Sequence, residues 1–305
     1  MVEQDNNGIL SIRESLVPKV RKENFMELLT KKLHPNCNIF LMSDIHEGTT
    51  TQSKTSLELV KDMVLSSKNN YVMIGGDLAE AITIDDKRYD IETVDSRASL
   101  PLLQYQNIVK YLKPLKNRII TILLGNHDYK LMKYGNFVKD YVCNELGVPY
   151  GTYTVKLAAL DKKGKITYKI FFTHGARSIS STADDPIRRE SNMLLQLKRR
   201  LQHKAGDCEV MAMGHTHRLL VSKPLPTLYL VDDGDQIIEE YTRPMSDRYI
   251  PPDHRFYANT GSFLKLYQRG VSGYAERFGY DPTELGFCII EIRDQKVYDV
   301  KKVVL

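Results

Sequence analysis

Cysteine is scarce in this sequence of 305 residues, which contains only four. No two of them are close enough in the sequence to form a CxxC pair, so a zinc site built on thiolates is not expected. Cys208 and Cys288 lie in apolar runs and are expected to be buried. A chain of this size needs no framework of disulfides, and a reducing compartment fits its cysteine usage.

Long apolar segments are also missing. No run approaches the ~20 apolar residues that a helix needs to cross a bilayer. The first 25 residues contain early acids and lack the apolar stretch of a signal peptide. We therefore expect a cytoplasmic protein that has no membrane contact. Hydrophobic residues make up 42% of the chain and charged residues 27%, which is typical of a globular protein with a sizeable core.

The excess of positive charge is small. The chain has 43 Lys and Arg against 38 Asp and Glu, which gives a formal net charge of +5. This balance allows an anionic substrate but does not require nucleic acid as a partner. No internal repeat or low-complexity tract is present, and nothing in the sequence determines the oligomeric state.

Two regions differ in pattern along the chain. Residues 1–35 form a charged N-terminal extension, and its segment 20–33 is compatible with a helix. In residues 36–305, short apolar runs alternate with segments of helical spacing at 57–65 and 101–115. Five runs have the length of buried strands, at residues 39–42, 71–74, 119–124, 170–172 and 210–213. This alternation predicts an α/β domain with much parallel sheet, richer in strands near its C-terminal end.

Each of the five runs ends at a polar cluster that contains His, Asp or Asn. The clusters are Asp44-Ile45-His46, Gly75-Gly76-Asp77, Gly125-Asn126-His127-Asp128, His174-Gly175 and Gly214-His215-Thr216-His217. One such cluster would usually be a turn or a helix cap. Ligand sites in α/β folds lie at the carboxyl ends of strands, so five clusters in series predict that these residues converge on one site.

The residue types in the clusters suit a pair of metal ions. A carboxylate has two oxygens and can bridge two cations, and Asp77 is the candidate. The imidazoles and Asn126 are neutral ligands. With Asp44 and Asp77 as anions, a site that holds two divalent cations keeps a charge of roughly +2, which suits a phosphate. Mixed nitrogen and oxygen ligands favour Mn, Fe or Zn over Mg or Ca, and we favour Mn.

The ordered motifs resemble those of the calcineurin-like metallophosphoesterase superfamily. The series Asp-x-His, Gly-Asp, Gly-Asn-His-Asp, His-Gly and Gly-His-Thr-His runs from Asp44 to His217. The segments 259–262 and 274–277 are similar to those of uncharacterised bacterial and phage members. The resemblance implies an α/β fold of two mixed β-sheets packed as a sandwich, flanked by helices, with the site at one sheet edge.

The resemblance also implies a role for each site residue. The first metal would be bound by Asp44, His46 and His217 and the second by Asn126, His174 and His215, with Asp77 bridging them. His127 would protonate the leaving group and would be oriented by Asp128. The implied reaction is hydrolysis at phosphorus, with in-line attack by a metal-bridging hydroxide.

The sequence departs from the family pattern just after the bridging residue. The family often has Asp three positions later, and here this position is Glu80. Protein serine/threonine phosphatases follow it with an Arg that binds phosphate, whereas this chain has Ala81. This argues against a protein phosphatase. Arg177 either replaces that Arg as a substrate-binding residue or is simply an exposed loop residue.

Three functions remain open at this point. The first is a phosphodiesterase or phosphomonoesterase that acts on a small phosphoester such as a nucleotide. The second is a DNA nuclease similar to the Mre11/SbcD nucleases, in which the basic face of a helix expected at 187–204 would contact phosphates and tyrosines between 241 and 280 would stack on bases. The third is a non-catalytic binding module, which the complete ligand set argues against. Substrate choice is expected to depend on residues 83–99 and 225–255.

Overall fold

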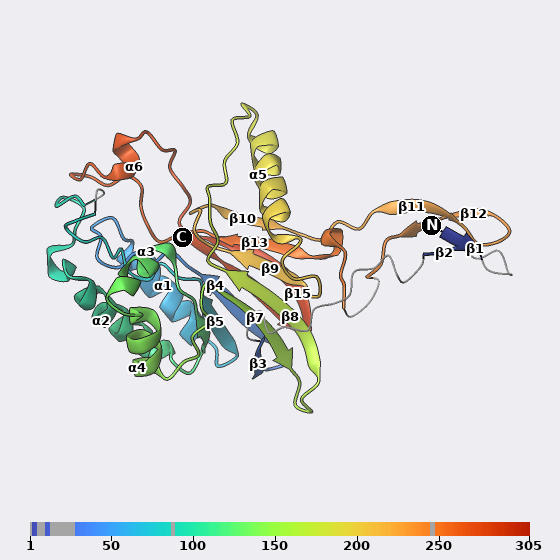
Figure 1. Cartoon of the computed structure of the whole chain (residues 1–305), viewed down its shortest axis with the longest axis horizontal. Coiled ribbons are helices and arrows are strands. Elements are labelled where there is room, and N and C mark those ends of the chain that lie inside the picture. Colours follow the sequence, from blue (N-terminus) through green and yellow to red (C-terminus); the bar gives the residue numbers. More distant parts are fainter. Residues whose placement is uncertain (1, 5–9, 13–27, 87–88, 245–247) are drawn as a thin grey trace.

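The computed structural model describes residues 2–4, 10–12, 28–86, 89–244 and 248–305. Two β-sheets pack face to face, and helices cover their outer faces (Figure 1). This is the mixed α/β sandwich that the sequence predicts. Most of the expected extension lies outside the described residues, apart from strands β1 (Val2–Gln4), β2 (Leu10–Ile12) and β3 (Leu28–Lys32).

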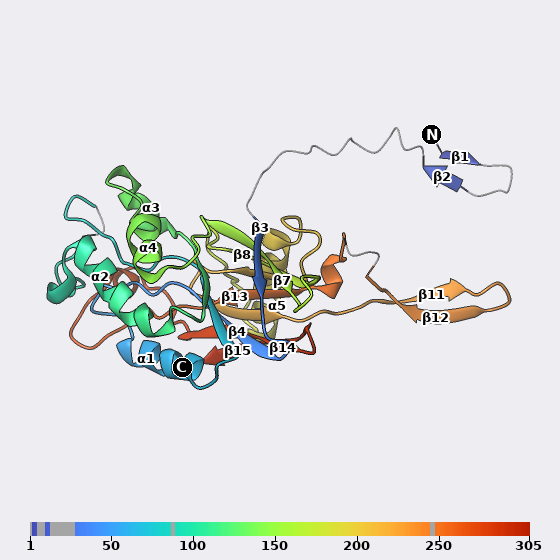
Figure 2. The same cartoon turned by 90° about the horizontal axis from the view of Figure 1, so that it is seen from below.

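The first sheet has five strands in the order β15-β14-β4-β5-β6. Its strands are β4 (Cys37–Met42), β5 (Asn70–Ile74), β6 (Ile119–Ile122), β14 (Gly286–Arg293) and β15 (Lys296–Val304). The strands β4, β5 and β6 are parallel, and β14 runs antiparallel to β4. Helices α1 (Lys54–Leu65) and α2 (Pro101–Leu112) cover its outer face (Figure 2).

The second sheet has six strands in the order β10-β13-β9-β8-β7-β3. Besides β3, its strands are β7 (Thr154–Leu160), β8 (Ile166–Thr173), β9 (Val210–Met213), β10 (Leu219–Ser222) and β13 (Phe256–Thr260). Helix α5 (Pro186–Leu201) packs on its outer face through Leu197 and Leu201. The remaining α-helices and strands are α3 (Asn126–Tyr129), α4 (Asn144–Leu146), α6 (Tyr274–Arg277), β11 (Leu228–Asp232) and β12 (Ile237–Tyr241).

Burial on both faces explains why β4 reads as one continuous apolar run. Successive side chains of a strand point to opposite faces of the sheet. Phe40 and Met42 pack toward helices α1 and α2, whereas Ile39 and Leu41 pack against the second sheet. Strands that are covered on both faces need apolar residues at every position. The prediction of buried strands at these runs is therefore confirmed.

One prediction for the N-terminal region is wrong. Residues 28–32 lie in the segment expected to be helical, but they form strand β3, which pairs in parallel with β7. The alternating burial of β3 shows the reason, since Leu29 and Lys31 point inward and their neighbours outward. Part of the expected extension is therefore an edge strand of the second sheet. All four cysteines are free and buried, and for Cys208 and Cys288 this burial was expected.

Candidate metal centre

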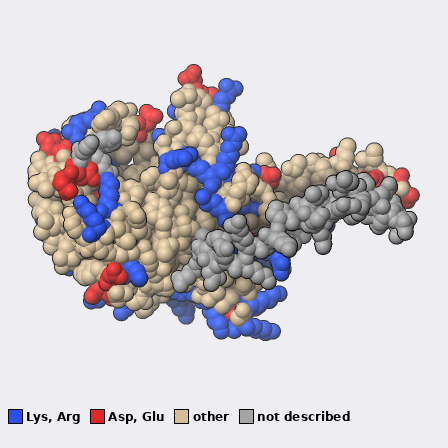
Figure 3. Space-filling view, viewed as in Figure 1, with Lys and Arg blue, Asp and Glu red and all other residues tan. Residues whose placement is uncertain are grey.

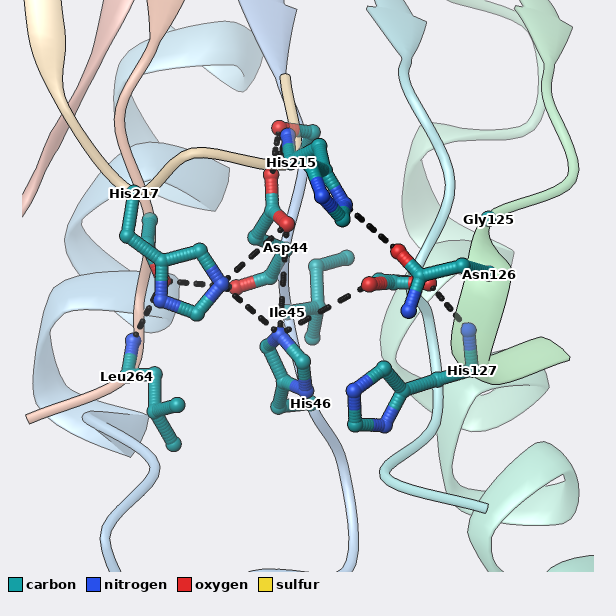
Figure 4. A network of polar contacts seen from close by, with 12 residues as sticks. Asp44, Ile45, His46, Gly125, Asn126, His127, His215, His217 and Leu264 are labelled. Atoms are coloured by element: carbon teal, nitrogen blue, oxygen red, sulfur yellow. Dashed lines mark hydrogen bonds and ion pairs between the residues drawn. The ribbon is translucent and has the colours of Figure 1, made fainter. Parts of the chain in front are cut away.

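The carboxyl ends of the strands bring the predicted ligands together between the two sheets. Asp44 and His46 follow β4, and His217 precedes β10. The Asp44 Oδ1 atom lies 3.3 Å from Nε2 of His217 and 3.9 Å from Nε2 of His46, and the two ring nitrogens are 3.2 Å apart. Figure 4 shows the two rings and the carboxylate converging on one point.

These three atoms, Oδ1 of Asp44 and Nε2 of His46 and His217, form a set of possible metal ligands. The Asp44 Oδ1 atom is buried and accepts no hydrogen bond within the described part of the chain. A buried carboxylate oxygen without a partner is costly. Two ring nitrogens that face each other can share a hydrogen bond only if one carries a proton there. A cation between the three atoms satisfies all of them, so this group fits a metal ion.

A second group lies beside the first. Asp77 follows β5, Asn126 begins α3, and His174 and His215 follow β8 and β9. The Asn126 Oδ1 atom lies 2.9 Å from Nε2 of His174 and 2.6 Å from Nδ1 of His215. A cation at this point requires the amide oxygen to face the rings. The opposite amide orientation would let the NH2 group donate to both rings, which is the hydrogen-bonded arrangement open to the metal-free protein.

Asp77 lies between the two groups. Its Oδ2 atom is 3.3 Å from Nε2 of His174 and 4.0 Å from Nε2 of His46. Its Oδ1 atom accepts a hydrogen bond of 2.8 Å from the backbone N–H of His127. This backbone contact fixes the carboxylate, so one oxygen faces both donor sets, as a bridging ligand requires.

Hydrogen bonds on the far side of two rings set their tautomers. The Nδ1 atom of His46 lies 2.7 Å from a carboxylate oxygen of Glu80, and Nδ1 of His174 lies 2.7 Å from the carbonyl oxygen of Gly75. An acceptor at Nδ1 keeps the hydrogen there and leaves the lone pair of Nε2 for a cation, an arrangement common in metal sites.

The metal-free site keeps protons on these same rings. Burial of the His46 ring opposes protonation, but Glu80, with Asp77 and Asp44, outweighs it and raises the pKa of His46 to about 9. For His174, burial is likewise outweighed by Asp77, and the pKa rises to about 9. The pKa of the buried Asp77 carboxyl is well below its usual range, since the nearby histidines outweigh the effect of burial. Protons thus balance the buried carboxylates where cations are absent.

The backbone is strained at most of these positions. Left-handed φ values occur at Asp44 (55°), His46 (52°), Asp77 (50°), His215 (71°) and His217 (55°). Such conformations in residues other than glycine cost about 1–3 kcal/mol each and concentrate at functional sites. Gly125 shows how tightly the loops approach, because a Cβ atom there would lie 2.0 Å from Oδ1 of Asp77.

Residues 37–219, more than half of the chain, match the calcineurin-like phosphoesterase family. The chain belongs to this family. It is therefore a hydrolase that acts on phosphoester bonds, in a family that binds divalent metals. No curated protein matches the chain. No helix in the described ranges is long and apolar enough to span a bilayer.

The solved structures that match this phosphoesterase share little sequence with it. Vps29 of Entamoeba histolytica in complex with zinc is 14% identical, with a TM-score of 0.37, and the match covers 88% of this chain and 98% of Vps29. The calcineurin-like phosphoesterase YfkN of Bacillus subtilis is 13% identical, with a TM-score of 0.35, covering 88% and 90%. The NAD nucleotidase NadN of Haemophilus influenzae is 12% identical, with a TM-score of 0.37, covering 88% and 50%.

Asp128 of this phosphoesterase does not hold the ring of His127, contrary to expectation. Its carboxylate accepts hydrogen bonds from the backbone N–H groups of Leu78 (3.2 Å) and Gly125 (3.1 Å) and from the Tyr105 hydroxyl (2.8 Å). Asp128 therefore joins the loop of Asp77 to the turn of Asn126. Burial raises the pKa of Asp128 to about 6, and the nearby Asp77 acts in the same direction.

The ring of His127 is positioned by the loop after Asp77 instead. Its Nδ1 atom lies 2.6 Å from the carbonyl oxygen of Glu80, and its ring meets the His46 ring edge-on with centroids 4.7 Å apart. Burial lowers the pKa of His127, although Glu80 and Asp77 act against this. Figure 4 shows the ring beside His46, on the side away from His217.

Two groups of residues that contact the candidate ligands were not predicted from the sequence. Glu80 was noted only as a departure from the family pattern, yet it contacts His46 directly. The segment 259–262 was noted without a role. Its Thr260 hydroxyl lies 2.5 Å from that of Ser43, which in turn donates to Asp44, and the Ser262 hydroxyl donates to the Asp44 carbonyl oxygen at 3.2 Å. Asn259 and Thr260 end strand β13 and Ser262 follows it, so this segment also lies at a strand end, and that position was the available signal.

The basic face expected on helix α5 is partly used inside the protein. The Arg200 guanidinium donates to the carbonyl oxygens of Ala176 (2.8 Å), Arg177 (2.7 Å) and Ser178 (2.5 Å). Lys198 forms an ion pair with Asp253. These two side chains therefore support loops, not a nucleic-acid surface. Arg177 is exposed, with a left-handed φ of 64°, on the loop that Arg200 holds after His174.

Proposed function

We propose that this phosphoesterase hydrolyses its substrate with two divalent cations, one in each donor group and both in contact with Asp77. The observation that carries the proposal is the shared position of Asp77 Oδ2, 3.3 Å from His174 of one group and 4.0 Å from His46 of the other. The partnerless Oδ1 of Asp44 and the acceptors behind His46 and His174 support it. We favour Mn, with Fe and Zn as alternatives, because the donors mix nitrogen and oxygen.

The cations, when bound, would activate the attacking water at neutral pH and offset the charge that develops at phosphorus. The chain's own residues hold this arrangement in place. The backbone N–H of His127 fixes Asp77, and Glu80 fixes the ring of His46. Since all these loops leave strands of the two-sheet core, we expect the site to be preorganised before substrate arrives, which favours catalysis.

His127 is the proposed general acid. The Glu80 carbonyl oxygen accepts the hydrogen of Nδ1, so the protonated form of the ring is the acid, and its Nε2 hydrogen would pass to the leaving oxygen. Asp128 acts indirectly, by positioning the turn that carries Asn126 and His127. We assign Arg177 to the substrate phosphate, because it follows His174 on a loop that Arg200 holds by three hydrogen bonds.

A small phosphoester such as a nucleotide is the proposed substrate, as a diester or a monoester. The nuclease alternative has lost support, because Arg200 and Lys198 of α5 have partners within the protein. The free, buried cysteines fit the reducing cytoplasm predicted from the sequence.

A substrate screen tests the proposal. Metal-depleted protein is reloaded with Mn and assayed on nitrophenyl monoesters and diesters, cyclic nucleotides, and single- and double-stranded DNA. We expect hydrolysis of a small ester that needs added metal and is lost in Asp77→Asn but kept in Asp62→Asn, an exposed carboxylate on α1. Hydrolysis of DNA alone would favour the nuclease. Hydrolysis that is equally fast without any metal would contradict the two-cation proposal.

A further inference from the structure

A long hairpin projects from the body of the protein at the end opposite the metal centre. We call residues 228–241, which comprise β11, β12 and their turn, the arm. His217 lies just before β10 and Thr260 at the end of β13, whereas the arm connects the other ends of these two strands. Both views show it extending away from the sheets (Figures 1 and 2). The arm is therefore remote from the site on its own chain.

The root of the arm is firmly anchored. Arg255, which is completely buried, donates hydrogen bonds to the carbonyl oxygens of Ile250 (2.6 Å), Gln202 (2.9 Å) and Ala205 (3.1 Å). Thr227 and Thr242 close the base by hydrogen bonds in both directions. Leu225, just before the arm, donates its backbone N–H to the carbonyl oxygen of Asp253 (2.8 Å), so the base of the arm is tied to the body.

The arm exposes apolar side chains on both of its faces. In the register of the hairpin, Leu230 and Ile237 lie on one face, and Tyr229 and Ile238 lie on the other. Leu230 is 68% exposed and Ile237 is 73% exposed. An isolated two-stranded hairpin is marginally stable in water, and exposed apolar strands with unpaired edges associate with other chains. The arm therefore has the properties of an interaction element.

The charge of the arm defines its partner. It contains five acidic residues and no Lys, Arg or His; the acids are Asp232, Asp233, Asp235, Glu239 and Glu240, of which Glu240 pairs with Arg243 just beyond the arm (2.9 Å). The whole chain has a net charge of +5 and the arm has −5, so the rest of the chain carries +10. Figure 3 shows acidic side chains at the free end of the arm and basic ones gathered on the body. Like charges repel, so this arm does not suit nucleic acid or an anionic membrane.

A complementary surface lies on the body. Lys32 on β3 and Lys162, Lys163 and Lys165 in the β7–β8 turn are exposed, and within the described residues they form no ion pair. Ile166, next to Lys165, is 43% exposed, and Leu28, at the other end of β3, is 49% exposed. This surface, the lysine patch, therefore offers the positive charge and the apolar contact that the arm needs. It lies at an edge of the second sheet, because β3 is the last strand.

We propose that two copies of the chain form a dimer in which the arm of each copy docks on the lysine patch of the other. In a two-fold dimer, each arm contacts the lysine patch of the other copy, so both arms and both patches are occupied. The assembly is therefore closed and does not extend into a chain of molecules. Within such a dimer, apolar contact supplies affinity, and the opposite charges set orientation and rate of association.

Sedimentation velocity of the full chain at micromolar concentration tests the proposal. We expect a species of twice the 35.0 kDa chain mass. Leu230→Ser/Ile237→Ser should weaken the dimer by about 100-fold, given the apolar surface that the two side chains would bury. Leu59→Ser/Leu65→Ser is the matched control, because these side chains are 50% and 42% exposed on α1, and it should leave the dimer intact. Melting curves check that both variants fold.

A charge exchange tests the assigned partner surface. Asp233→Lys/Asp235→Lys on the arm and Lys162→Glu/Lys163→Glu on the patch should each weaken the dimer. The chain that carries all four changes should regain it, because the two surfaces are complementary again. A monomeric wild type, a dimer that is indifferent to the arm variants, or a fourfold variant as weak as its parents would each overturn the proposal. None of these measurements depends on catalysis.

Discussion

Replacing His127 by Asn separates proton donation from metal binding. The Nδ1 atom of the His127 ring forms a hydrogen bond with the Glu80 carbonyl oxygen. The contact with the Asp77 carboxylate is made instead by the backbone N–H of His127. The substitution removes the ring but keeps this backbone contact. We therefore expect His127→Asn to keep both metals and to lose only what the ring contributes to catalysis.

The size of the loss depends on the leaving group. An alkoxide is strongly basic and needs a proton as it departs, whereas a nitrophenolate does not. General acid catalysis contributes about 10²–10⁴-fold, so kcat/KM on an alkyl phosphate ester should fall by about that factor. On a nitrophenyl ester the loss should be below about tenfold, since little proton transfer is needed.

The assay measures kcat/KM on both esters, with metal content determined in parallel. His203→Asn, which changes an exposed histidine after α5, is the control and should behave like wild type. Equal losses on the two esters with both metals retained would refute the leaving-group role. Loss of one metal would show that His127 is itself a ligand.

Three further predictions follow from the geometry of the site. Asp77→Ala should bind at most one metal per chain and lose activity while keeping its circular dichroism spectrum. If anomalous scattering showed two metals ~3.5–4 Å apart in this variant, the bridging role of Asp77 would be refuted. Asp128→Ala leaves buried N–H groups without an acceptor, so urea denaturation should show a loss of about 2–3 kcal/mol, with the ratio of rates on the two esters unchanged. A changed ratio would restore the orienting role. His46 and His174 have pKa values raised to about 9, so their protons stabilise the metal-free fold below the unfolded pKa of about 6.5, and this stability is lost as pH rises toward 9. Metal affinity should rise over the same pH interval, because metal binding displaces these protons. Isothermal titration calorimetry in buffers of different ionisation enthalpy would detect the released protons. A metal affinity that stays constant with pH would contradict this prediction.

The convergence of the candidate ligands could be predicted from the sequence, because these side chains lie at the ends of strands. Strands buried on both faces appear as short apolar runs, and the polar cluster after each run is visible in the sequence. Parallel strands then place these clusters at one end of the sheets. For this reason the structure brings all seven predicted ligands together, although they are distributed from Asp44 to His217.

Several contacts that were not predicted involve backbone groups, which have no sequence signature. The partner of the His127 ring is a backbone carbonyl oxygen 47 residues away, and any residue could supply it. Asp128 was expected to hold the neighbouring ring, but its carboxylate instead satisfies backbone N–H groups across the site. Strand β3 has leucines and lysines that also suit a helix, and its identity comes from pairing with β7 far along the chain.

The same features make the metal-free site unfavourable and prepare it for cations. Asp44 and Asp77 are almost completely buried, and five site residues hold left-handed backbone conformations that cost about 1–3 kcal/mol each. The two-sheet core compensates for this cost, since apolar strands such as β4 are buried on both faces. Because the loops are already held in these conformations, cation binding need not organise them. The free energy of binding can then displace the protons that balance the buried carboxylates, and cations should stabilise the fold as well as enable the reaction.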